Sequence, residues 1–84
     1  MGRRGNTPLL YMRIYTFRLN FTSDEVLGFY QGQIKAVSVM TEQQIRLQFP
    51  FHHLKPFVSQ IGIRGRFRLE LSEHNQIHKI EKIS

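Results

Sequence analysis

Three arginines separated by single residues are the part of this sequence best suited to do chemistry. Arg64, Arg66 and Arg68 alternate with Gly65 and Phe67. On an extended strand alternate side chains share a face, so the three guanidinium groups would follow one another at a spacing of ~6.6 Å. A guanidinium group binds a phosphate or a carboxylate through paired hydrogen bonds. The pattern therefore predicts an anion-binding face, with a nucleic acid backbone or an acidic protein as the partner.

Other charged residues would modify this patch. Arg18 and Arg46 occupy outward positions of two further expected strands and would extend it. Glu70 stands on the same face as Arg68 and is expected to pair with it, which would weaken the positive field. Two other interpretations stay open, namely an ordinary solvated sheet face and a face that binds a protein or a second copy of the chain.

Base recognition is not expected from this strand. Residues 64–69 are similar in part to the basic-glycine-aromatic pattern of RNA-recognition strands. In those strands aromatic rings face the RNA and stack on its bases. Here Phe67 is expected to point away from the arginines and into the core. Any contact with nucleic acid would therefore be made to phosphates, with little base readout.

No metal site, cofactor site or catalytic residue is predicted, and the chain is not expected to be an enzyme. His52 and His53 are adjacent, so their side chains would diverge on most backbones, and no cysteine completes a zinc site. His74 and His78 would meet at helical spacing but not on a hairpin. The one aspartate, Asp24, is explained by a helix start, and no nucleophile is provided with a base.

The elements that carry these residues are expected in the order β-α-β-β-short α-β-β. Alternation of apolar and polar residues, which is the period of a half-buried strand, predicts five strands. Their ranges are 13–21, 33–41, 44–49, 63–72 and 76–83. The predicted fold class is α+β, a small curved antiparallel sheet with one main helix packed on its apolar face. The strand order is left open by this pattern.

The main helix has clear start and stop signals. Thr22 and Glu25 have the spacing of a reciprocal capping box, and Phe21 with Val26 that of a hydrophobic staple. Gly32 is well placed to end the helix.

The segment 51–62 is expected to be a loop followed by a short helical turn, with Pro56 near the first position of that turn. Ile61 is expected to help close the end of the core. Gly62 is predicted to adopt a positive φ, and Gly65 to mark a bulge or a close approach of backbone.

Length and composition indicate one domain, which we expect to span 12–84. Residues 1–11 show no periodicity and are expected to form a disordered N-terminal extension, with Met12 as a candidate start that N-terminal mass spectrometry would test.

The net charge of +6 favours polyanionic partners, and removing Arg3 and Arg4 leaves ten basic against six acidic side chains. The lack of cysteine fits a cytoplasmic location, and no apolar run reaches the ~20 residues of a membrane span.

The last expected strand indicates self-association as an alternative function. Ile77, Ile80 and Ile83 recur every third residue, so this strand is not cleanly one-faced. An exposed edge with isoleucines needs cover, and a symmetric homodimer would supply it.

Four short motifs follow one another along the chain: Tyr30-Gln31-Gly32, Gln48-Phe49-Pro50, His53-Leu54-Lys55-Pro56-Phe57 and Gly62-Ile63-Arg64-Gly65-Arg66-Phe67. The series resembles the bacterial domain-of-unknown-function family 2835, from about Met12 to Ile83. The resemblance implies a short single-domain protein with no assigned catalytic residues. Some relatives bear a topoisomerase label, which would make the chain an accessory of such an enzyme. An ATP-driven enzyme is not expected, because the phosphate-binding glycine loop is missing.

Overall fold

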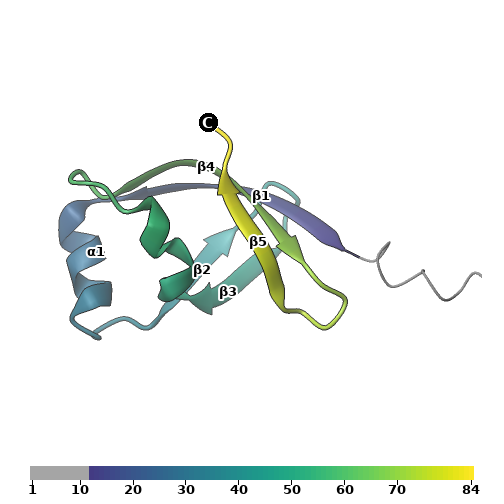
Figure 1. Ribbon diagram of the computed structural model, residues 1–84, viewed down its shortest axis with the longest axis horizontal. Helices are drawn as coiled ribbons and strands as arrows, with labels where there is room; N and C mark the ends of the chain where they lie inside the picture. Colours follow the sequence, from purple (N-terminus) through teal and green to yellow (C-terminus); the bar gives the residue numbers. More distant parts are fainter. Residues whose placement is uncertain (1–11) are drawn as a thin grey trace, which may run out of the picture.

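The computed structural model describes residues 12–84, and the extension expected at 1–11 lies outside them. The described chain has an α+β fold in which antiparallel strands predominate over two short helices (Figure 1). The elements are β1 (Arg13–Phe21), α1 (Ser23–Tyr30), β2 (Ala36–Met40), β3 (Arg46–Pro50), the 3-10 helix η3 (Phe51–Phe57), β4 (Ile63–Leu71) and β5 (Ile77–Lys82).

The five strands of residues 12–84 form two sheets rather than the single sheet that was predicted. β4 is the central strand of a three-stranded sheet in the order β1-β4-β5, and β2 pairs with β3 in a separate hairpin. The turn of this hairpin occupies the free edge of β1. The Glu42 amide donates to the Thr16 carbonyl oxygen at 2.8 Å, and the Thr16 amide donates to Gln43 Oε1 at 2.9 Å. β1 and β2 are not paired in a ladder, and the hairpin contacts this edge through its turn.

The core lies between the two sheets. Phe17 of β1 stacks on Phe67 of β4 with ring centroids 6.0 Å apart, and Phe49 of β3 lies at the same distance from Phe17. All three rings are buried, and η3 adds the buried Leu54. The hairpin and η3 lie on the same side of the three-stranded sheet in Figure 1. The other buried apolar side chains are Leu19, Val26, Val37, Val39, Phe51, Ile63, Leu69 and Leu71.

The helix α1 begins and ends where its signals predict. Thr22 Oγ1 accepts a hydrogen bond from the Glu25 amide at 3.2 Å, and the Glu25 carboxylate accepts one from the Thr22 amide at 2.8 Å. Gly32 follows the end of the helix with a φ of 78°. The prediction of one main helix packed on the apolar face holds only in part, because α1 has eight residues, of which only Val26 and Gly28 are buried, and sits at one end of the sheet (Figure 1). Neither helix of residues 12–84 is long and apolar enough to cross a membrane.

Two glycines bracket the start of β4 for reasons of space, as predicted. Gly62 has a φ of 112°, and a Cβ there would lie 1.9 Å from the Phe21 carbonyl oxygen. Gly65 has a φ of 141°, and a Cβ there would lie 2.6 Å from Lys82 Cε and 2.7 Å from the Ser84 carbonyl oxygen. At both Gly62 and Gly65, therefore, the backbone lies in close contact with another part of the chain.

Other details differ from the sequence expectations. β2 begins at Ala36, three residues later than predicted. η3 begins at Phe51, so Pro56 lies inside the helix near its end rather than near its first position. The ring of Phe51 is buried and stacks on Phe29, with centroids 4.4 Å apart, which holds the start of η3 against α1. Ile61 is 61% exposed instead of closing the core.

The strands expected at 63–72 and 76–83 form a hairpin. Asn75 has a φ of 62° in its turn, and β5 pairs antiparallel with β4. Ile77 and Ile80 pack against the core, whereas Ile83 lies beyond the end of β5 and is exposed.

Candidate anion-binding face

The strand β4 carries the predicted arginines on extended backbone, and β1 brings a fourth arginine beside them. In the antiparallel register Arg64 lies opposite Asn20, and Arg66 lies opposite Arg18. Phe67 is fully buried, and because side chains alternate along a strand the arginines on either side of it lie on the surface away from the core. We call this surface the outer arginine face; it comprises Arg18, Asn20, Arg64, Arg66 and Arg68.

The charge of Arg66 is compensated by an acid from the other sheet. Arg66 Nε donates to Glu42 Oε2 at 2.8 Å, and its second nitrogen donates to Glu42 Oε1 at 2.7 Å. Thr16 Oγ1 donates to the same carboxylate at 2.8 Å. The hydrogen bonds from Arg66, and then from Thr16, lower the pKa of Glu42 to about 2, and the same contact raises the pKa of Arg66. Glu42 therefore stays ionised over the physiological range and holds Arg66 in place.

Arg68 is compensated from within its own sheet. Its guanidinium contacts Glu70 at 2.5 Å, which confirms the pairing expected from the sequence, and Glu81 of β5 at 3.1 Å. The hydrogen bond to Glu70, supported by that to Glu81, raises the pKa of Arg68. Glu81 was not foreseen, because its position opposite Arg68 depends on the register of β4 and β5. Glu81 also accepts a contact from Lys79 at 3.4 Å.

Arg18 and Arg64 form no ion pair with any acid among residues 12–84. They are diagonal neighbours on the paired strands, a relation that places side chains ~7–8 Å apart. Arg18 is near enough to Glu42 to contribute to its lowered pKa, but the carboxylate bonds to Arg66. A hollow of about 330 Å³ is lined by Arg18, Leu19, Asn20, Arg64 and Gly65. Two cations of the outer arginine face thus have no acidic partner within residues 12–84, and they line a common hollow.

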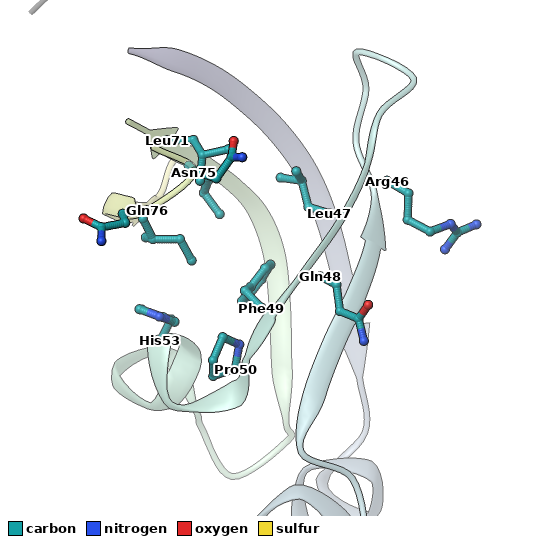
Figure 2. Close-up of a pocket in the computed structure, with 11 residues that line it drawn as sticks. Arg46, Leu47, Gln48, Phe49, Pro50, His53, Leu71, Asn75 and Gln76 are labelled. Carbon is teal, nitrogen blue, oxygen red and sulfur yellow. The ribbon is translucent and has the colours of Figure 1, made fainter. Parts of the chain in front are cut away.

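Arg46 lies apart from this face. It belongs to β3 in the second sheet, where its guanidinium donates to Ser38 Oγ of β2 at 3.2 Å. In Figure 2 its side chain points away from the cavity that β3 helps to form. The structure therefore brings together four of the five arginines singled out from the sequence.

A second cavity, of about 450 Å³, opens between β3 and the hairpin of β4 and β5 (Figure 2). Leu47 and Phe49 line one side of it, and His53 faces it from η3. Burial, and then the neighbouring His52, lower the pKa of His53 and so favour its neutral form. Sequence reasoning missed this cavity, because its walls come from segments that only the tertiary fold brings together.

The two adjacent histidines lie closer than expected. The rings of His52 and His53 have centroids 4.1 Å apart, because the tight helix η3 holds them on neighbouring sides. Within the described part of the chain, no group of three or more potential metal ligands is found around them or elsewhere.

Comparison with known proteins gives a family but no close structural or curated relative. No curated protein and no solved structure matches the chain. A family model described as a protein of unknown function, DUF2835, matches residues 13–83. The match includes every strand and helix described above and all residues of the outer arginine face. The family resemblance seen in the sequence motifs is therefore confirmed, and the chain belongs to the DUF2835 family.

Proposed function

We propose that this protein is a binding module rather than an enzyme, and that its outer arginine face contacts an anionic macromolecule. The observation that carries the proposal is the state of Arg18 and Arg64, which line one hollow and have no acidic partner among residues 12–84. The other two arginines of the face are each bonded to at least one carboxylate. An excess of positive charge is therefore concentrated at one end of the face.

Electrostatics support a ligand at this end. Like charges on neighbouring strands destabilise a sheet unless something compensates them. Arg66 is compensated by Glu42 and Arg68 by Glu70, but the described part of the chain supplies no such group for Arg64. An anionic partner would provide it, and the net charge of +6 would attract that partner from a distance.

A homodimer through β5 remains the alternative function. Ile83 is exposed next to this edge strand, which favours an apolar contact. Lys79 and Lys82 also lie on β5, however, and lysines on an edge strand oppose pairing with another edge. The outer arginine face is therefore the better-supported contact surface.

Retention on immobilised heparin and on duplex DNA at low salt would test the proposal. We expect retention that weakens steeply with salt, because each phosphate contact releases condensed counterions. The double variant Arg18→Gln/Arg64→Gln should elute at clearly lower salt than the native protein. Its matched control is Lys35→Gln/Lys55→Gln, which removes the same charge from exposed residues outside the three-stranded sheet.

Two results would contradict the proposal. One is the absence of retention of the native protein on either matrix at low salt. The other is equal loss of retention in both double variants, since that would trace binding to net charge alone. Size-exclusion chromatography of the native protein at high micromolar concentration would test the homodimer alternative, which a strict monomer would contradict.

A further inference from the structure

The hollow beside Arg64 allows a more specific inference, which rests on the proposed function. We infer that the hollow lined by Arg18, Asn20 and Arg64 is a seat for one phosphate group of a nucleic acid backbone. The partner would then be a phosphodiester strand, bound without regard to its base sequence.

The geometry of the three side chains favours a phosphate. Arg18 and Asn20 are two residues apart on β1 and so share a face at ~6.6 Å, and Arg64 lies directly opposite Asn20 on β4. The three side chains therefore form a triangle with two guanidinium groups and one amide. A tetrahedral phosphate presents oxygens in several directions and can accept from all three donors, whereas a carboxylate presents two oxygens in one plane.

The charges around the hollow also favour a phosphate. None of the five residues that line it is acidic. Arg66 does not line the hollow and is bonded to Glu42, whereas the polar side chains that line it are those of Arg18, Asn20 and Arg64. The site thus offers positive charge together with donors that have no acceptor among residues 12–84.

The rest of the face explains why bases would not be read. The outward positions of β1 and β4 carry Ile14, Thr16, Arg18, Asn20, Arg64, Arg66, Arg68 and Glu70, none of which is aromatic. Single-stranded nucleic acids are read mainly by stacking bases on aromatic side chains. Without such rings on this face, contact is confined to the sugar-phosphate chain.

Fluorescence anisotropy with short labelled strands would test the inference. The probes are a single strand of mixed sequence, the same strand with every base removed, and the duplex. We expect the abasic strand to bind within about twofold of the intact strand, because the phosphates carry the interaction. Inorganic phosphate at millimolar concentration should compete weakly, and poly-glutamate of equal charge should compete less well than an unlabelled strand.

Substitutions at the seat would show where the nucleic acid strand binds on the protein. Asn20→Asp places a carboxylate between the two guanidinium groups and should weaken binding roughly tenfold or more. The matched control is Gln48→Glu, the same change on an exposed residue of β3. Arg64→Gln should reduce the slope of log Kd against log salt by about 1, which is the contribution of one phosphate contact. Glu42→Gln should instead tighten binding, because it frees the neighbouring Arg66.

The outcomes separate this inference from the proposed function. If the strand binds but Asn20→Asp and Arg64→Gln leave its Kd and salt slope unchanged, the seat is wrong while the binding module stands. If the abasic strand fails to bind, or poly-glutamate displaces the strand equally well, a phosphate is not the ligand. If no probe binds to the native protein at low salt, both the seat and the proposed function fall. Thermal unfolding of each variant shows that lost binding is not lost fold.

Discussion

Single residues determine how closely the chain approaches itself at the start of β4. Gly62 and Gly65 both have positive φ, and in both cases the space for a Cβ is already taken. At Gly62 the obstacle is the backbone carbonyl of Phe21, which cannot rotate away. At Gly65 it is partly the flexible tail of Lys82, although the Ser84 carbonyl oxygen is almost as close. Gly62 therefore lets the start of β4 lie close to the end of β1, and Gly65 lets β4 lie close to the C-terminal residues Lys82 and Ser84.

We predict that Gly62→Ala destabilises the protein by about 3 kcal/mol or more, because strain at positive φ adds to a clash with rigid backbone. Gly32→Ala is the matched control, since Gly32 also has a positive φ of 78° but no atom within 4 Å of the added Cβ. It should cost only about 1 kcal/mol. Urea denaturation of both variants would measure the difference. Equal costs would show that the contact with Phe21 does not constrain the native state.

Among the elements, the hairpin of β2 and β3 links the two sheets through its turn. Backbone and side-chain bonds from Glu42 and Gln43 saturate Thr16 at the free edge of β1. The same Glu42 then reaches Arg66 on β4 and so spans two strands of the sheet. This turn protects an edge that would otherwise be open to pairing with another chain. Through Glu42 it also makes Arg66, rather than Arg18, the arginine that is bonded to an acid.

The stability that the contact between Glu42 and Arg66 contributes should fall as the pH is lowered. The pKa of Glu42 is lowered in the folded protein from 4.5 to about 2, so its contribution to stability is complete above about pH 4.5. It is lost as the pH falls from about 4.5 to 2, where the native carboxylate takes up its proton. Thermal unfolding measured over this range should show the native protein losing more stability than Glu42→Gln, which cannot titrate.

Salt provides a control for this prediction. The side chains of Glu42 and Arg66 are both more than a third exposed, so added salt should reduce the difference between the two proteins. Parallel pH profiles for the native protein and Glu42→Gln would show that the ion pair does not stabilise the fold.

The whole molecule depends on the layer of rings between its two sheets. Phe17 and Phe67 come from one sheet and Phe49 from the other, and all three are buried. A chain of this size buries a smaller fraction of its surface than a larger domain does, so each of these contacts is a large share of its stability. The short helix α1 closes one end of this core rather than forming a second layer.

We predict that Phe17→Leu destabilises the protein by about 1–3 kcal/mol and that Phe17→Ala does so by about 3–5 kcal/mol, because the sheets cannot collapse fully around the lost ring. Ile61→Ala is the control, since Ile61 is 61% exposed and should change stability by no more than about 0.5 kcal/mol. Chemical denaturation monitored by circular dichroism would rank the variants. A cost for Phe17→Ala close to that of Ile61→Ala would show that the two sheets are not held together by this layer.

The sequence by itself determined the local features of this protein. The capping box at Thr22, the positive φ at Gly62 and the five alternating strands were all predicted from the residue types and their local spacing. The common face of the three arginines on β4 also follows, because it needs only the two-residue period of a strand. The pairing of Arg68 with Glu70 belongs to the same class, since both residues lie on that strand.

Only the tertiary structure decided how these parts combine. The division into two sheets, the contact between Glu42 and Arg66, and the hollow between Arg18 and Arg64 join residues that are 24 to 46 positions apart or depend on strand order. Alternation within a strand shows which side of the strand is buried, but it carries no information about its neighbours or their register. Which of Arg18, Arg64 and Arg66 is bonded to an acid, and with it the candidate site, was therefore decided by the tertiary arrangement of the two sheets.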